Sequence, residues 1–364
     1  MLSVHSFGED IMKRVSSLQL AISFVGLFLG AGFVSGQELW QFFACFGSAG
    51  LFGFLISVSL ALLIDYALLR LSQTTGCTAI GQLILPNSDG WGRRLIDVMQ
   101  CLLLLGIVVI MIAGASALLH DLTGLSAPVC GLLFLLVLFP AALFELRGIV
   151  TAFSVLVPIT GVTAVVLGIG ILFRENFQLA PAVGSSSLLT PTWWVSGVTY
   201  ASYNLFGTIA ILVPFASLIP DTKTIRRGLG LGALILMLLT FSILASLIAV
   251  PESGLAELPT AALAAQLHPV LGMGYNLLMG MGMFSSALAT IIALLTQLGL
   301  ICPVIQRRRR SFLVLFCLAG YLLSLLGFGN LVGLIYPLFG YLSVPFLFLL
   351  VRNWWKSKKT QKVF

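Results

Sequence analysis

The stretch LGAGFVSGQE, from Leu29 to Glu38, lies inside the first long apolar run of the chain. It places three glycines within seven residues, and a carboxylate follows almost directly. Each glycine weakens a helix by about 1 kcal/mol relative to alanine, and charged side chains are rare at membrane depth. An irregular backbone is tolerated there only where it lines a cavity or is buried in protein. The stretch therefore predicts a helix break that forms a binding site.

Close helix packing is the alternative explanation for these glycines. Gly32 and Gly36 are four residues apart, which is the spacing of small residues where membrane helices approach closely. Packing alone does not account for Gln37 and Glu38, which come next. We therefore favour a binding site over a packing motif.

The composition places the chain among integral membrane proteins. Of its 364 residues, 59% are hydrophobic and 9% are charged, with a mean hydropathy of +1.10, which no ordinary soluble domain shows. A membrane-spanning helix needs about 20 apolar residues. We predict one all-α transmembrane domain over residues 1–364 with ten spans, at 18–46, 50–71, 95–119, 127–144, 149–173, 192–218, 229–250, 270–298, 312–328 and 331–351.

The basic residues support this count. With alternating spans and a cytoplasmic N-terminus, 18 of the 19 Lys and Arg residues fall on the cytoplasmic side, and only Arg174 falls outside. This is the asymmetry that sets membrane orientation, so we expect both termini in the cytoplasm. Arg307–Arg310 lie in a short loop between spans, which argues against a nucleic-acid partner.

The ten segments divide into two halves of five, at about 18–173 and 192–351. If these halves are inverted repeats, the sixth span should be interrupted like the first, and a polar, glycine-containing stretch does lie at Ser202–Gly207. Paired broken helices at matching positions are typical of transporter binding sites. Free amides near Ser35 and Gly36 would attract an anion and freed carbonyls a cation, so a zwitterion such as an amino acid fits both.

The candidate substrate-binding residues come from the two expected breaks and from a polar position in the third span. Aromatic side chains flank the second break, and Gln100 interrupts an otherwise apolar helix. The full set is Gly32, Ser35, Gly36, Gln37, Glu38, Gln100, Tyr200, Tyr203, Asn204 and Phe206.

A sodium site is expected where the first and eighth spans meet. Sodium prefers hard oxygen ligands, and Ser285 and Ser286 supply adjacent hydroxyls after a glycine-rich run. The alternative is that each serine bonds back to its own helix. The proposed ligands are the carbonyls of Gly30, Phe33 and Gly282 with the hydroxyls of Ser285 and Ser286.

Three acidic residues lie within or at the ends of spans. Glu38 is a proton carrier, a ligand for substrate or cation, or a structural acceptor for nearby amides. Asp65 and Asp97 lie toward the inner ends of their spans. We expect them to pair with nearby basic side chains, as an inner gate or as interfacial anchors; the candidates are Lys13, Arg14, Arg70, Arg93 and Arg94.

Ten spans, broken first and sixth helices and a hydroxyl pair in the eighth resemble the LeuT-type secondary transporters of the amino acid–polyamine–organocation superfamily. The segment GAGFVSGQELWQFF at 30–43 more specifically resembles the bacterial YkvI-type membrane proteins of that superfamily. This resemblance implies alternating access in a bacterial cytoplasmic membrane, with substrate between spans one, three, six and eight. Some relatives replace the sodium with a lysine in span five, and 149–173 contains none, which favours sodium.

The expected function is therefore sodium-coupled symport of an amino acid or related small organic solute. The alternative is a proton-coupled symporter or exchanger that uses Glu38. An enzyme is not expected, because none of the three histidines lies at mid-membrane and the chain shows no convincing cluster of metal ligands. The sequence predicts no organic cofactor and leaves the substrate and oligomeric state open.

Overall fold

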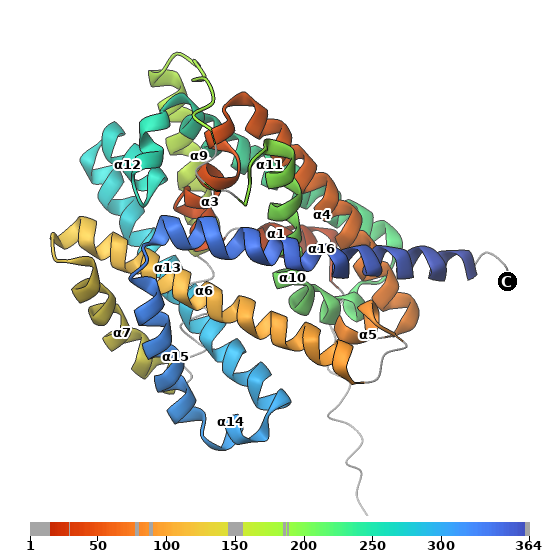
Figure 1. Cartoon of the computed structure of the whole chain (residues 1–364). Coiled ribbons are helices and arrows are strands. Elements are labelled where there is room, and N and C mark those ends of the chain that lie inside the picture. The colour runs from red at the N-terminus through yellow and green to blue at the C-terminus, as the bar shows by residue number, and fades with distance from the viewer. Residues whose placement is uncertain are drawn as a thin grey trace, which may run out of the picture.

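The computed structural model describes residues 15–28, 30–76, 80–86, 90–144, 156–184, 187 and 189–360, and the regular elements in these ranges are helices (Figure 1). The α-helices are α1 Ser17–Phe28, α2 Ala31–Val34, α3 Gln37–Phe42, α4 Ser48–Thr75, α5 Ile80–Ile84, α6 Trp91–Thr123, α7 Ala127–Leu143, α9 Leu156–Arg174, α10 Trp193–Phe215, α11 Thr222–Ala249, α12 Pro259–Leu267, α13 Pro269–Ile301, α14 Pro303–Arg307, α15 Arg309–Ser324 and α16 Phe328–Thr360. Three short 3-10 helices join them: η1 Ala44–Phe46, η2 Ala216–Leu218 and η3 Pro251–Leu255.

Each predicted apolar segment overlaps at least one of these helices. Within the described ranges, α4, α6, α11, α13 and α16 are long and apolar enough to cross a membrane. Shorter apolar helical stretches lie at Ser17–Gly26, Ala127–Leu143 and Pro158–Arg174. The all-α membrane class is confirmed, whereas the number of ten spans and the division into two repeats stay predictions.

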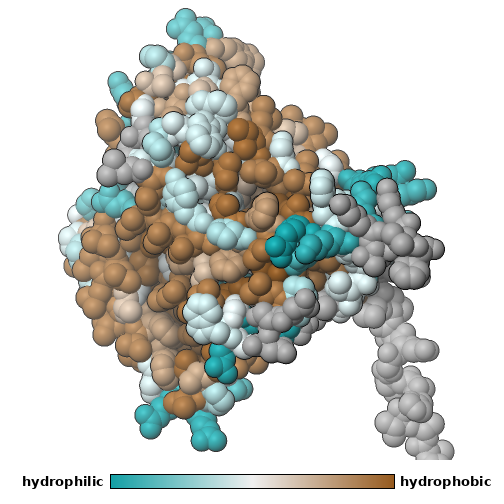
Figure 2. All heavy atoms as spheres, turned by 45° about the vertical axis from the view of Figure 1, so that its right-hand side comes forward, coloured by the Kyte–Doolittle hydropathy of each residue, from teal (hydrophilic) through white to brown (hydrophobic). Residues whose placement is uncertain are grey.

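The surface is that of a protein whose solvent is largely lipid. Apolar side chains cover most of the coloured face in Figure 2, and hydrophilic ones lie at its edges and in a band across its middle. Large aliphatic side chains stand exposed on several helices, including Leu136 on α7 (71% exposed) and Leu238 on α11 (66%). Apolar exposure of this extent fits contact with lipid chains better than contact with water.

Helix α10 lies at the centre of the packing, against α4 on one side and α16 on another. Glycines bring α10 and α4 close together: a Cβ on Gly197 would collide with the carbonyl of Gly53. The Ser57 hydroxyl on α4 donates to the Gly197 carbonyl at 2.7 Å. Small residues thus let the two backbones approach, and a side-chain hydrogen bond joins them.

The predicted interruption at Ser202–Gly207 is wrong, because α10 runs unbroken from Trp193 to Phe215. Its polar side chains bond back to the preceding turn of the same helix. Ser202 donates to the Val198 carbonyl at 2.8 Å, and Asn204 donates to the Tyr200 carbonyl at 3.1 Å. A polar stretch can therefore remain helical within the protein interior, since its groups are satisfied without a break.

Two stretches at the ends of predicted spans also have defined structure. The alanine-rich stretch at 255–267, between two predicted spans, contains the helix α12, Pro259–Leu267. The ninth segment, predicted to run to 328, ends as α15 at Ser324, and the chain turns at Gly327, whose φ of +90° favours glycine.

We expect Gly197→Ala to destabilise the protein by about 1–3 kcal/mol, because the added methyl group meets backbone rather than a movable side chain. Thermal unfolding of purified protein in detergent measures the effect. Gly230→Ala on α11 is the matched control, since nothing lies within 4 Å of its Cβ position. Equal stability of the two variants would show that the α4–α10 contact is not tight.

Candidate functional site

The first span is broken, as the glycines predicted. Helix α1 ends at Phe28, the single-turn helix α2 follows, and α3 begins at Gln37. Gly36 joins α2 to α3 with φ of +80°, in the left-handed region where side chains are strained. Ser35 closes the turn, because its hydroxyl donates to the Gly32 carbonyl at 2.8 Å and accepts from the Gln37 amide at 3.3 Å.

The Glu38 carboxylate sits in the space that Gly32 leaves. A methyl group on Gly32 would collide with the Glu38 side chain. The carboxylate is buried, with the residue 4% exposed, although it lies within the first span. Among the described Lys, Arg and His residues, none forms an ion pair with it. The glycine that interrupts the helix therefore also makes room for the acidic group beside the break.

Aromatic rings from two other helices surround this carboxylate. The Tyr203 hydroxyl on α10 donates to Glu38 Oε2 at 2.7 Å. Tyr203 stacks on Tyr336 of α16 with ring centroids 4.4 Å apart and nearly parallel planes. Tyr200 packs edge-on against Tyr203 at 5.4 Å, and its own hydroxyl is buried with no hydrogen-bond partner in the described part of the chain. Tyr200 and Tyr203, which were expected to flank a second break, lie instead beside Glu38 at the first, and their role in substrate binding stays a prediction.

A cap formed by η3 and α12 covers the break. The Thr260 amide donates to the Ser35 carbonyl at 2.9 Å. The Thr260 side chain lies over Gly36, where a Cβ would collide with it. Trp40 of α3 packs in the same way against Gly254 of η3. The cap supplies a hydrogen bond to the broken backbone and closes the break on that side.

Two further contacts secure the cap and the break, and no sequence pattern predicts either of them. The Tyr275 hydroxyl on α13 donates to the Val34 carbonyl at 2.5 Å. Glu257 accepts from the amides of Phe328 and Gly329 at 2.8 and 3.1 Å, which satisfies the first turn of α16. A spacing rule cannot find these residues, because their partners are distant in sequence.

Gln37 lies beside this junction with an unused acceptor. Its side chain packs against Gly329, and the residue is 3% exposed. Its Oε1 atom is buried without a hydrogen-bond partner among the described residues. Buried polar atoms are nearly always satisfied in native proteins, so this oxygen marks a position where a ligand could donate.

The amides expected to attract an anion are engaged in this conformation. The Gly36 amide donates to the Phe33 carbonyl at 3.1 Å, and the Gln37 amide donates to Ser35. The acceptors presented at the break include the Glu38 carboxylate and the Gln37 amide oxygen, and the unpaired Tyr200 hydroxyl lies beside them.

Two predicted residues lie in other surroundings. Gln100 is buried on α6, and its Oε1 accepts from Gln297 Nε2 of α13 at 2.8 Å. Phe206 is buried on α10 and packs against Phe346 of α16, with ring centroids 6.1 Å apart. In this conformation both side chains join helices to one another.

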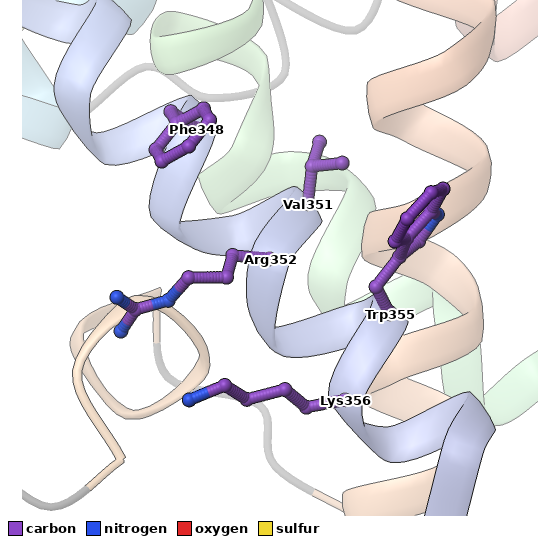
Figure 3. Close-up of a pocket in the computed structure, with 5 residues that line it drawn as sticks. All are labelled: Phe348, Val351, Arg352, Trp355 and Lys356. Atoms are coloured by element: carbon purple, nitrogen blue, oxygen red, sulfur yellow. The ribbon is translucent and has the colours of Figure 1, made fainter.

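Two cavities of the described chain are lined by residues outside the break. An apolar groove of about 810 Å³ runs between α6, α7 and α13. A second cavity of about 460 Å³ lies at the end of α16, where Figure 3 shows Arg352 and Lys356 extending to the same side. Neither of these two cavities is lined by a predicted site residue.

No family model matches the chain. Two curated proteins of Bacillus subtilis (strain 168) are similar over nearly their full lengths. The uncharacterized membrane protein YkvI is 28% identical over 338 residues, which cover 92% of this chain and 95% of YkvI. The uncharacterized protein YyaD is 22% identical over 339 residues, which cover 91% and 96%.

Solved structures resemble the whole fold. MhsT in complex with L-phenylalanine aligns with a TM-score of 0.58 at 14% identity, covering 91% of this chain and 88% of MhsT. A Na⁺-coupled sialic acid symporter aligns with a TM-score of 0.54 at 14% identity, covering 91% and 75%. A manganese transporter of Eremococcus coleocola aligns with 0.54 at 16% identity, covering 92% and 78%. The chain has the LeuT fold.

Within this LeuT fold, the predicted sodium ligands lie on adjoining elements. Helix α13, which carries Gly282, Ser285 and Ser286, packs against α2. The Gly30 and Phe33 carbonyls each accept one backbone amide, at 3.1 Å, and each oxygen keeps a second lone pair for an ion. Convergence of these five residues on one sodium ion stays a prediction.

We expect Gly32→Ala to destabilise the protein by about 1–3 kcal/mol, because the new methyl group overlaps the Glu38 carboxylate. Adding Glu38→Ala should restore part of that loss, so the two changes are not additive. Thermal unfolding of both single variants and the double variant measures the coupling. Gly26→Ala, with open space at its Cβ position, is the control; strict additivity would contradict the contact.

We expect Tyr203→Phe to cost about 1–3 kcal/mol, because it leaves the buried Glu38 carboxyl without its hydrogen-bond donor. Tyr341→Phe is the matched control. It also removes a hydroxyl, one that donates to the Leu189 carbonyl at 2.6 Å, but Tyr341 is 42% exposed. Thermal unfolding compares the two, and an equal loss in both would contradict a special role for the Glu38 contact.

Proposed function

We propose that this protein is a secondary active transporter that moves a small organic solute, an amino acid or a related amine, together with sodium. The observation that carries the proposal is the buried Glu38 carboxylate at the break of the first span, without a cationic partner among the described residues. A carboxylate in a low-dielectric interior needs a compensating charge. A substrate ammonium group or a coupling cation supplies it.

The rest of the break supports a donor-rich substrate. The Gln37 Oε1 atom is buried and unused in the described part of the chain, and the Tyr200 and Tyr203 rings lie close to the carboxylate. An ammonium group would donate to the oxygens and gain cation–π attraction from the rings. This chemistry suits the positively charged end of an amino acid or an organic amine.

The fold supports transport as the purpose of this site. The solved relatives include a Na⁺-coupled sialic acid symporter and a manganese transporter. The cap of η3 and α12 closes the break on one side, which is the arrangement that alternating access requires of one of its states. Sodium is our proposed coupling ion, at Gly30, Phe33, Gly282, Ser285 and Ser286.

Ligand binding is the first test. Purified protein is heated with single amino acids or amines, in sodium or in potassium buffer. A substrate present at about 100 times its Kd should add about 2.7 kcal/mol of stability. We expect stabilisation by an amine-bearing solute that is larger in sodium and absent in Glu38→Ala. Stabilisation only by solutes without an amine would contradict the role of Glu38.

We expect uptake of that solute into proteoliposomes to need a sodium gradient. Ser285→Ala and Ser286→Ala should raise the sodium concentration that gives half-maximal uptake. Ser59→Ala, which removes an exposed hydroxyl bonded to its own helix at Leu55, is the control. Accumulation without sodium, driven by a pH gradient and lost in Glu38→Gln, would replace sodium with the proton as coupling ion.

A further inference from the structure

Asp65 is a second buried carboxyl group, and it lies well away from the break in sequence. It belongs to α4, and the residue is 1% exposed. Both of its side-chain oxygens are buried, and neither has a hydrogen-bond partner among the described residues. Glu38, by comparison, has the Tyr203 hydroxyl. Asp65 is therefore the less satisfied of the two acids.

The expected pairing of Asp65 with a basic side chain is not found among the described residues. Arg70 donates to Gln73 Oε1 at 3.2 Å, on the same helix. Arg226 of α11 lies over the neighbouring Tyr66, 5.7 Å from the ring centre, with Nη2 3.5 Å from the hydroxyl. Lys13 and Arg14 lie outside the described residues. The expectation of an inner salt bridge is therefore wrong for the described candidates.

The position of Asp65 on α4 explains why its side chain is shielded from solvent. It shares the buried face of the helix with Ala61 and Leu68, each 0% exposed. It stands midway between two polar attachments of α4 to the α10 region, at Ser57 and Gln73, each about 12 Å away along the helix. Those side chains donate to the Gly197 carbonyl at 2.7 Å and to the Ile219 carbonyl at 3.0 Å.

The elements packed against α4 form no ion pair with Asp65 through their described residues. They are α5, α10, α11, α16, η1 and η2, and none of their described residues forms an ion pair with Asp65. Their described ionisable groups are Cys45, Tyr200, Tyr203, Lys223, Arg226, Arg227, Tyr336, Tyr341, Arg352, Lys356 and Lys358.

An ionised carboxylate without a partner costs several kcal/mol in a protein interior, whereas the protonated acid is neutral. A metal ion would need several oxygen ligands, but the described neighbours one turn away on the same face, Ala61 and Leu68, are apolar, and the described residues hold no group of three metal-binding side chains. We propose that Asp65 is a proton-binding site, which holds a proton while α4 is packed against its neighbours and releases it when this interface opens to water.

The consequence is a link between proton binding and conformation, whichever solute the protein carries. If the open arrangement binds one proton fewer than the packed one, a rise in pH favours opening. This site is separate from Glu38, so protons could act on the protein even where sodium drives transport.

Infrared difference spectroscopy of the protein in lipid nanodiscs tests the proposal without a substrate. The side-chain carboxyl of aspartate is isotope-labelled, so that aspartate bands move and glutamate bands do not. We expect a protonated aspartate band that persists at neutral pH, is absent in Asp65→Asn and remains in Asp97→Asn, which alters a partly exposed aspartate of α6. A neutral-pH band that is missing from wild type, or unchanged in Asp65→Asn, overturns the proposal.

A second measurement covers the case in which the Asn variant folds poorly. Wild type should lose thermal stability as pH rises from mildly acidic to mildly alkaline, because unfolding ionises Asp65. Asp65→Asn mimics the neutral acid and should lose less stability over that range, whereas Asp97→Asn should follow wild type. If Asp65→Asn is not recovered, the labelled wild-type spectrum alone decides whether a buried aspartate is protonated.

Discussion

A helix interrupted inside a membrane frees backbone groups that lipid cannot satisfy, and the structure around the first span follows from this constraint. The Ser35 carbonyl takes the Thr260 amide, and the Val34 carbonyl takes the Tyr275 hydroxyl. The Ser35 side chain closes the turn itself. Residues of α12 and α13 therefore bond to the break, so that three segments far apart in sequence meet there.

The same constraint shapes the chemistry of the site. Small residues at Gly32 and Gly36 leave space that the Glu38 carboxylate and the Thr260 side chain fill. The Gly36 and Gln37 amides donate to the Phe33 carbonyl and the Ser35 hydroxyl, whereas the acceptors Glu38 and Gln37 Oε1 remain buried with one partner and none among the described residues. Buried acceptors with few partners fit the cationic, donor-rich ligand that we propose.

The sequence predicted the first break correctly, but the second break that it predicted, in α10, is absent. Gly36 needs a left-handed backbone, which is a local property that the residue type reveals. The stretch Ser202–Gly207 looked similar in composition, yet its side chains bond within α10 and the helix continues. Whether a polar residue ends a helix or satisfies itself depends on neighbours that a sequence pattern does not contain. For the same reason, no sequence pattern predicts the contacts of Thr260, Tyr275 and Glu257.

The sequence by itself determined the membrane class, the helical fold and the position of the first break, because hydropathy, helix length and glycine conformation are local properties. Only the tertiary structure decided that Glu38 lies against Gly32, that Gln100 pairs with Gln297, and that Asp65 is buried without a partner among the described residues. The reason is physical: hydrogen bonding and burial depend on which distant helices pack together, and in a membrane many of those helices present nearly the same apolar surface.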